Sequence, residues 1–223
     1  LVIENGIYAG YHTEKLANEG MVGILVTNSP KAIAPWGGIS GVFGTNPIAF
    51  AAPRKDTAPL VIDLSLSKIA RGKVMVASQD GRPIPDDWAL DAEGKPTADA
   101  DAALAGTMLP MGDAKGAALV LMVEILAAAV SGAQFGFEAS SLFNSDGPPP
   151  RLGHTYIALN PELLSGGGFV ERLEVLLEAI TTQPNVRLPG QRRLDGRAMA
   201  NEKGISVPDN LYEKVTAMLP DAA

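Results

Sequence analysis

Three short stretches carry residue types that can bind a pyrophosphate group. Residues 63–67 combine a carboxylate with two hydroxyls, Lys115 lies between Gly112 and Gly116, and residues 189–193 place two arginines beside a glycine. Pyrophosphate is bound by backbone N–H groups, helix N-termini, cations and hydroxyls. Each stretch alone is better explained by turns or capping, and Asp63 serves equally well as a cap. Only their coincidence suggests a nucleotide site.

The remaining titratable residues give weaker signals. Glu124 interrupts an apolar stretch, so it is either a buried, hydrogen-bonded carboxylate or a surface-facing residue, and a structural role is favoured in both cases. His12 and His154 are the only histidines, neither has a second ligand at metal-binding spacing, and cysteine is absent. We therefore predict no metal site. Arg71 and Lys73 are expected on a solvated edge.

The elements that must position these residues alternate between strands and helices. Apolar runs predict strands at 22–26, 48–51, 60–64 and 155–159, and periodic or capped segments predict helices at 13–19, 117–130, 168–182 and 209–219. Thr13 is the expected N-cap of the first helix, and Lys115 lies near the start of the long apolar helix. Residues 80–101, rich in Pro, Gly and Asp, predict a surface excursion. This alternation indicates an α/β protein, and the G-x-G-x-x-G fingerprint is absent.

Composition and charge indicate which binding partners and which cellular compartment to expect. The 223 residues carry a net charge of −7, with lysines and arginines scattered along the chain, so nucleic acid is not an expected partner. The longest apolar stretch, residues 117–130, is too short to span a membrane and contains a glutamate. The lack of cysteine fits a reducing compartment, so we expect a cytoplasmic protein.

Six segments between about residue 9 and residue 193 match, in the same order, the motifs of a known protein family. They read GILVTNSPKAIAPWGG, GTNPIAFAAPR, PLVIDLSLSKIARGKV, GRPIPDDWALDAEGKPT, LPMGDAKGAALVLMVEILA and VRLPGQRR. Together they resemble the type 2 malate/L-lactate dehydrogenases, a superfamily with sulfolactate and ureidoglycolate dehydrogenases and cyclic-imine 2-carboxylate reductases. The resemblance implies a mixed sheet flanked by helices, in a sulfolactate dehydrogenase-like NAD(P)-binding fold that is not a classical Rossmann fold.

The resemblance also implies a function. It implies an enzyme that uses NAD or NADP to transfer a hydride to or from C2 of a small 2-hydroxy or 2-oxo acid, such as malate or lactate. It further implies a homodimer with sites near the subunit interface. By motif, the cofactor-binding residues would be Ser29, Asp63, Leu64, Ser65, Leu66, Ser67, Lys115, Gly190, Gln191 and Arg192. All except Ser29 lie in the three stretches found from residue chemistry.

The chain departs from the family pattern at its N-terminal side. Family members carry a further segment there, with a helical substrate-binding part, a catalytic histidine and an arginine for the substrate carboxylate. We therefore expect residues 1–193 to form the NAD(P)-binding domain and residues 194–223 to form a helical segment that packs on that missing part. The family's second histidine aligns with Asn5, and His12 is not assigned as the acid, so the catalytic residues are unknown.

Three functions stay open at this point. The first is an oxidoreductase of this family, represented by its cofactor domain. The second is a catalytically inactive nucleotide-binding or dimerisation module that keeps the fold. The third is an enzyme that acts on an activated substrate such as an imine and takes its proton from water.

Overall fold

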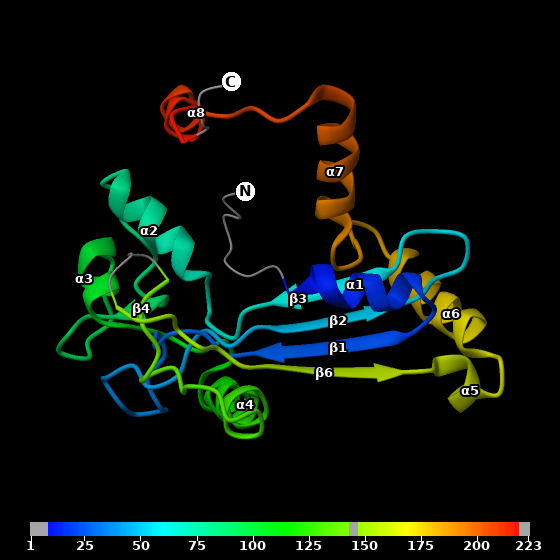
Figure 1. Ribbon diagram of the computed structural model, residues 1–223, viewed down its shortest axis with the longest axis horizontal. Coiled ribbons are helices and arrows are strands. Elements are labelled where there is room, and N and C mark those ends of the chain that lie inside the picture. Colours follow the sequence, from blue (N-terminus) through cyan, green and yellow to red (C-terminus); the bar gives the residue numbers. More distant parts are fainter. Residues whose placement is uncertain (1–8, 143–146, 219–223) are drawn as a thin grey trace.

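A four-stranded sheet forms the centre of the computed structural model, which describes residues 9–142 and 147–218. Its strand order is β3-β2-β1-β6, with bounds β1 Val22–Thr27, β2 Ile48–Ala52, β3 Leu60–Leu64 and β6 His154–Leu159 (Figure 1). The four predicted strands are confirmed to within one residue.

The pairing of these strands differs from the mixed sheet that we expected. All three pairs, β1 with β2, β1 with β6 and β2 with β3, are antiparallel. Strands β1, β2 and β3 are consecutive neighbours, and their connections contain no helix. A parallel pair needs a longer crossover, usually a helix, to carry the chain back to the starting end of the sheet. The α/β class and the departure from the classical Rossmann fold are confirmed.

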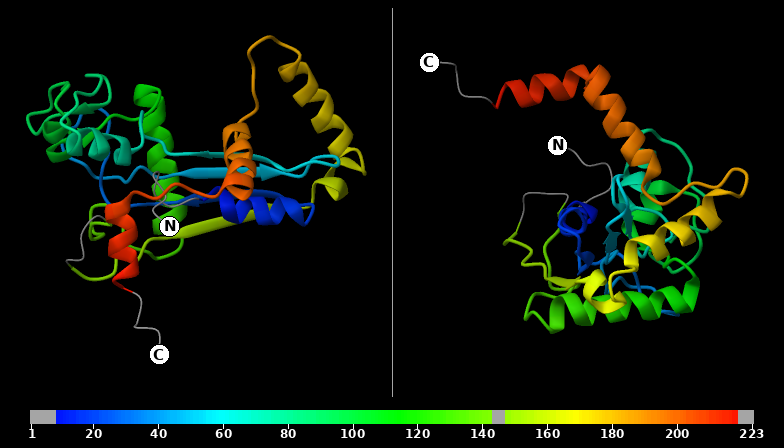
Figure 2. Two further views of the ribbon diagram at one scale, coloured as in Figure 1. Left: turned by 90° about the horizontal axis from the view of Figure 1, so that it is seen from above. Right: turned by 90° about the vertical axis from the view of Figure 1, so that its right-hand side faces the viewer.

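Helices cover both faces of the sheet. Helix α1, Gly10–Asn18, lies on one face, and helix α4, Asp113–Glu124, lies on the other and continues into a π-helical turn, η1, Ile125–Ala129 (Figure 2). Thr13 is not the N-cap of α1, because it lies inside the helix and its hydroxyl donates to the carbonyl of Gly10 at 3.1 Å. Lys115 lies in the first turn of α4, as predicted. No helix within the described ranges is long and apolar enough to cross a membrane.

The largest hydrophobic core lies at one end of the sheet. Helices α2, Arg71–Gln79, and α3, Ala100–Ala105, and the short strands β4, Ala89–Leu90, and β5, Thr107–Met108, pack there against α4. Its fully buried side chains include Ile33, Leu66, Val74, Met108 and Val120. Residues 80–101 are therefore more than a surface excursion, because Ile84 and Ala89 are buried in this core.

Arg71 does not lie on a solvated edge. Its guanidinium is partly buried at the start of α2 and donates to the carbonyl of Leu104 at 3.0 Å. Burial lowers the pKa of Arg71. Lys73, two residues further on, is exposed as expected.

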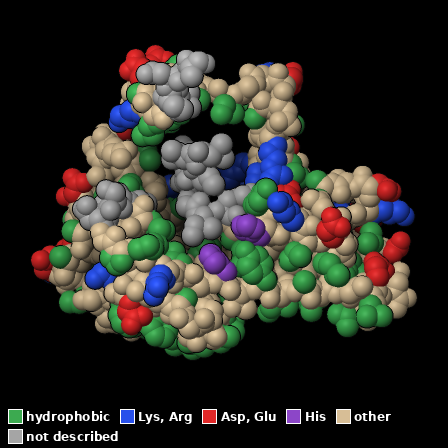
Figure 3. Space-filling view, viewed as in Figure 1, with side chains coloured by type: hydrophobic (Ala, Val, Ile, Leu, Met, Phe, Trp, Pro, Cys, Tyr) green, Lys and Arg blue, Asp and Glu red, His purple; other side chains and the backbone are tan. Residues whose placement is uncertain are grey.

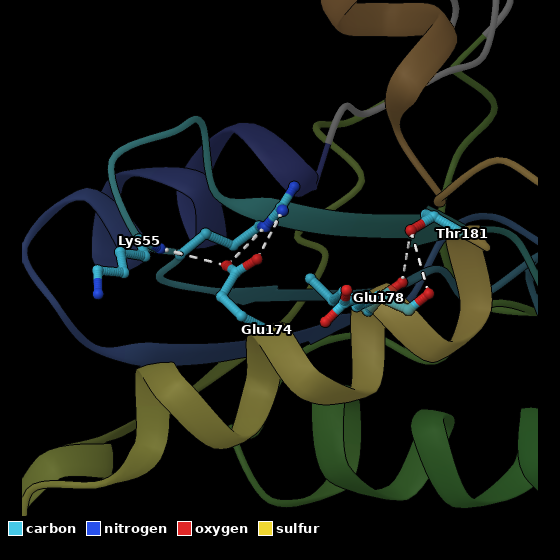
Figure 4. A network of polar contacts seen from close by, with 6 residues as sticks. Lys55, Glu174, Glu178 and Thr181 are labelled. Carbon is cyan, nitrogen blue, oxygen red and sulfur yellow. Dashed lines mark hydrogen bonds and ion pairs between the residues drawn. The ribbon is translucent and has the colours of Figure 1, made fainter.

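Four helices follow the sheet: α5, Pro161–Ser165; α6, Phe169–Thr181; α7, Gln191–Lys203; and α8, Asp209–Thr216. Arg54, in the β2–β3 connection, makes a bidentate ion pair with Glu174 of α6, and the backbone N–H of Lys55 donates to the same carboxylate (Figure 4). Among the residues of α6, only Leu177 is buried.

Helices α7 and α8 project from one side of the molecule (Figures 1 and 2). Arg197 ties α7 to α1 through a bidentate ion pair with the buried Glu14, at 2.6 and 2.7 Å. The domain boundary expected after residue 193 falls inside the first turn of α7. Helix α8 matches the predicted final helix, whose last residue, 219, lies outside the described residues.

Candidate functional site

The loops that carry the expected cofactor residues leave the sheet at one end. In the strand register, Thr27 pairs with His154, Val26 with Ile48, and Ile48 with Leu64. In this antiparallel arrangement, the end of β1, the start of β2, the end of β3 and the start of β6 lie side by side. Ser29, the Gly-Thr-Asn-Pro turn at 44–47 and residues 65–67 therefore follow or precede neighbouring strand ends.

Ser29 is fixed to the turn that precedes β2. Its Oγ accepts the backbone N–H of Thr45 at 2.9 Å and lies 3.3 Å from the Thr45 hydroxyl. The carbonyl of Thr45 accepts the N–H of Leu66 at 2.7 Å. A Cβ at Gly44 would lie 2.1 Å from the carbonyl oxygen of Ser29, so glycine is required for this approach. The two expected contacts Ser29 and Leu66 are thus joined through Thr45.

Residues 65–67 lie against the start of α4. The carbonyl of Leu66 accepts the N–H of Met111 at 2.9 Å, two residues before the helix begins. Ser65 and Ser67 have their hydroxyl oxygens 3.2 Å apart, whereas the side chain of Leu66 is fully buried in the core. The structure therefore brings the two hydroxyls to the same region as the first turn of α4, which carries Lys115.

The start of α4 has the chemistry of an anion site. Gly112 and Asp113 both have positive φ, 67° and 56°, so two successive residues are left-handed where the helix begins. The first N–H groups of a helix have no partner within it, and they form the positive end of the helix dipole. Lys115 adds an exposed cation beside them. This set of donors fits a pyrophosphate group.

Asp63 and the turn at 190–192 meet β3 on the side of α1. The Asp63 carboxylate accepts the N–H of Gly10 at 2.8 Å. Burial raises the pKa of Asp63, against the opposing effects of this hydrogen bond and of the nearby Arg193 charge. Gly190, with φ 81°, starts α7 so close to β3 that a Cβ would lie 2.7 Å from the carbonyl oxygen of Val61.

The ten expected residues thus fall into two groups that β3 joins. Ser29 and residues 64–67 connect to the start of α4, whereas Asp63 and residues 190–192 lie toward α1 and α7. Within the second group, Arg192 is exposed and the Gln191 side chain donates to Asp195 at 2.9 Å. The strand β3 is the element that places both groups.

Glu124 is the residue whose role the sequence left least defined. It is 3% exposed, so of the two positions that the sequence left open, the structure shows the buried, hydrogen-bonded one. Its Oε1 accepts Asn28 Nδ2 at 3.2 Å and the Gly136 N–H at 2.7 Å, and its Oε2 accepts Asn46 Nδ2 at 2.7 Å. The two asparagines stand in the TNS and GTNP motifs, but nothing in the sequence signals that they converge on one carboxylate.

Both histidines lie on one face of the molecule (Figure 3). The His12 ring, on α1, makes an edge contact with Tyr156 of β6, with 6.0 Å between ring centroids. Burial, and to a smaller extent the neighbouring His12, lowers the pKa of His154. Neither histidine is assigned as a proton donor, and Asn5 lies outside the described residues. Among the described residues, no group of three or more metal-ligating side chains could hold a metal ion.

Two curated proteins with similar sequences are a dehydrogenase and a reductase. The chain is 52% identical over 211 residues to (2R)-3-sulfolactate dehydrogenase (NADP(+)) of Chromohalobacter salexigens, which covers 94% of this chain and 62% of that protein. It is 42% identical over 209 residues to Delta(1)-pyrroline-2-carboxylate reductase of Pseudomonas fluorescens, which covers 92% of this chain and 62% of the relative. The chain thus spans less than two thirds of the length of these relatives.

Two solved structures of a reductase and a dehydrogenase are similar to this chain in fold. The delta1-piperideine-2-carboxylate reductase of Pseudomonas syringae pvar. tomato has a TM-score of 0.87 at 36% identity, over 94% of this chain and 64% of that one. The sulfolactate dehydrogenase of Methanocaldococcus jannaschii has a TM-score of 0.83 at 34% identity, over 94% and 61%. The sequence profile of the malate/L-lactate dehydrogenases matches residues 6–216. The chain therefore belongs to the malate/L-lactate dehydrogenase family.

Proposed function

We propose that the chain binds NAD or NADP and forms the cofactor-binding part of an oxidoreductase. The reaction is hydride transfer between the nicotinamide and C2 of a 2-hydroxy or 2-oxo acid. The observation that carries this proposal is the connection of Ser29, residues 65–67 and the start of α4 by the hydrogen bonds through Thr45 and Leu66. These stretches, far apart in the sequence, supply hydroxyls, helix N–H groups and a lysine together.

Each group in the site has a separate task in this proposal. The start of α4 and Lys115 bind the pyrophosphate, while Ser65 offers a hydroxyl beside it. Ser67 is 4% exposed and donates to the Ile69 carbonyl at 2.6 Å, so it holds the turn next to Ser65. Asp63 and the turn at 190–192 bind further along the same dinucleotide, at the α1 side of β3. When bound, the cofactor supplies or accepts the hydride. The residues of this chain bind it and hold its orientation.

NADP is the dinucleotide that we favour. The 52% identical relative is named as an NADP(+) enzyme. Arg192 is exposed in the first turn of α7 and provides a cation for a 2′-phosphate. NAD lacks that phosphate, so this arginine would add less to the binding of NAD than to that of NADP.

The proposed substrate is a small acid with a reactive C2. Sulfolactate is the first candidate because it is the substrate named for the 52% identical relative, and malate and lactate follow from the family description. A cyclic imine 2-carboxylate is the second candidate, favoured by the 42% identical reductase and by the structural likeness at a TM-score of 0.87. Both classes present a carboxylate beside the carbon that gives or receives the hydride.

We also propose the assembly in which this activity occurs. Helices α7 and α8, which project from the domain, would pack on a further substrate-binding part of the protein, within a cytoplasmic homodimer. The exposed apolar residues Tyr212, Val215 and Met218 of and beside α8 support such packing. A catalytically inactive module with the same fold is the alternative.

The test is titration with NADPH and NADH, followed by nicotinamide fluorescence, and then a turnover assay. Sulfopyruvate, oxaloacetate, pyruvate and Δ1-pyrroline-2-carboxylate are the acceptors to compare. We expect saturable binding, with a lower Kd for NADPH than for NADH. When the protein that is assayed includes its proton donor, we also expect at least one of these acceptors to oxidise NADPH. Binding without turnover of any acceptor would favour the inactive module, and no binding of either dinucleotide would contradict the proposal.

A further inference from the structure

Glu124 lies at a buried position, where an unpaired carboxylate would lose its hydration and destabilise the fold. It is the last residue of α4, where the π-helical turn η1 begins, and it is 3% exposed. A buried carboxylate is tolerated when several donors replace its lost water. Here three N–H groups do so, at 2.7, 2.7 and 3.2 Å.

Those three donors come from three different segments. Asn28 follows β1, Asn46 precedes β2, and Gly136 follows η1. Asn28 is held on both sides, because its Nδ2 also donates to the Gln134 carbonyl at 2.8 Å and its Oδ1 accepts the Gly153 N–H at 2.9 Å. Glu124 is therefore the point at which the loops beside the candidate site are tied to α4.

The link from Glu124 to the candidate site passes through Asn46. The Asn46 Oδ1 accepts the Ser29 N–H at 3.4 Å, while its Nδ2 donates to Glu124 and to the Val120 carbonyl. Asn46 has a φ of 40° and is followed by Pro47. A left-handed residue before proline is an unfavourable conformation that surrounding contacts must hold.

The same helix thus contacts the site from both of its ends. The first turn of α4 carries Lys115 and begins two residues after Met111, whose N–H donates to the Leu66 carbonyl. The N–H of Leu66 in turn donates to the Thr45 carbonyl. Thr45 precedes Asn46, whose side-chain amide donates to Glu124 at the end of the helix. These bonds form a closed circuit through α4, residue 66 and the turn at 44–47.

We propose that Glu124 is a positioning residue for the dinucleotide site. Its carboxylate fixes Asn28 and Asn46, and through them it sets the distance between Ser29, Leu66 and the first turn of α4. This inference rests on the proposed function, since it concerns the affinity of the same site. Glu124 itself is too deeply buried to contact the dinucleotide.

The test is the dinucleotide Kd of Glu124→Gln, measured on the whole chain by nicotinamide fluorescence with NADPH. Gln keeps the size of the side chain but presents an N–H2 group to an environment made of donors, so one of the three bonds is lost. We expect the Kd to rise about tenfold or more at a temperature where the variant is folded.

Leu177→Ala is the matched control for lost stability. Leu177 is 3% exposed in α6 and lines a hollow with Arg54 and Leu188, so its truncation lowers stability without removing a hydrogen bond of the circuit. We expect its Kd to stay within about twofold of the unsubstituted chain. An unchanged Kd in Glu124→Gln, with unfolding temperature lowered as in Leu177→Ala, would make the role of Glu124 merely structural and overturn the inference.

Asn46→Gly supplies the second variant, because glycine accepts the positive φ while removing the amide. Combined with Glu124→Gln, it should raise the Kd by less than the product of the two single effects, because both act through one link. Multiplicative effects would overturn the inference while leaving the proposed function intact. An unsubstituted chain that binds neither NADPH nor NADH would instead remove the proposed function, and the inference with it.

Discussion

Lys115 is the residue with the most direct expected effect on binding. It is exposed in the first turn of α4, where its charge adds to that of the helix N–H groups. We predict that Lys115→Gln raises the dinucleotide Kd about tenfold and weakens the salt dependence of binding. Fluorescence titration at two salt concentrations measures both. Lys73→Gln, an exposed lysine on α2, is the control, and equal Kd changes in the two variants would refute the assignment of Lys115.

Asp63 gives a prediction about pH. Because burial raises its pKa, the folded state binds the Asp63 proton more tightly than the unfolded chain does. The contribution of Asp63 to stability is therefore largest at low pH and declines as pH rises through the raised pKa. The substitution Asp63→Asn keeps an acceptor for the Gly10 N–H without the charge. We predict that the unfolding free energy of this variant, relative to the unsubstituted chain, increases from about pH 4 to about pH 7.

Denaturant titration at a series of pH values measures this difference. A relative stability of Asp63→Asn that falls as pH rises would show that the Arg193 charge and the Gly10 hydrogen bond outweigh burial. Burial would then not be the dominant influence on the pKa of Asp63.

At the scale of elements, an ion pair between Arg197 and Glu14 contributes to the anchoring of α7 on α1. Arg197 holds the buried Glu14 of α1, and this contact lowers the pKa of Glu14. Loss of the arginine leaves a buried carboxylate without its partner, so Arg197→Gln should cost roughly 2 kcal/mol of local stability. Hydrogen exchange of residues 191–203 should accelerate. Lys203→Gln, at the exposed end of the same helix, is the control and should leave this exchange unchanged.

The same ion pair predicts the direction of an acid effect. A carboxyl with a lowered pKa contributes stability above its ordinary range and loses it as pH falls through the lowered value. The difference in exchange between the unsubstituted chain and Arg197→Gln should therefore shrink on acidification. A difference that grows at low pH would contradict the role of Glu14.

The start of α4 depends on a glycine. A Cβ at Gly116 would lie 1.6 Å from the Met111 carbonyl oxygen, so Gly116→Ala must push the preceding turn away from the helix. We predict a loss of roughly 1–3 kcal/mol in unfolding free energy, together with weaker dinucleotide binding. Gly196→Ala, in α7 with no atom within 4 Å of the new Cβ, should instead stabilise by up to about 1 kcal/mol. Equal effects of the two substitutions would refute the steric argument.

At the scale of the whole molecule, local sequence signals predicted some elements and missed others for physical reasons. The four strands were predictable because short apolar runs end in proline, glycine or polar turns. The bounds of α7 were not predicted, although residues 194–223 were expected to be helical, because none of its side chains is buried and no apolar periodicity marks it. Helices α2 and α3 are short, with few buried residues each. The antiparallel order of the sheet is set by pairing between strands, which no single run encodes.

The candidate site, too, was only partly predictable from the sequence. Residue chemistry was enough to find three stretches, because pyrophosphate binding needs hydroxyls, helix N–H groups and cations. The sequence predicted a structural role for Glu124 but did not decide between a buried and a surface position, because its partners Asn28 and Asn46 lie 96 and 78 residues away in the sequence. Contacts over such separations arise from the fold and leave no local pattern.

Hydrogen exchange with and without saturating NADPH tests the central claim most directly. The account predicts slower exchange on binding in residues 27–30, 44–46, 63–67, 112–116 and 189–192 together, because one dinucleotide would contact or order them all. A hollow of about 320 Å³ at residues 77–83 and 98–101, lined by Ser78, Arg82 and Asp99, provides the contrast. Protection confined to that hollow, or spread over the domain without these five segments, would contradict the account.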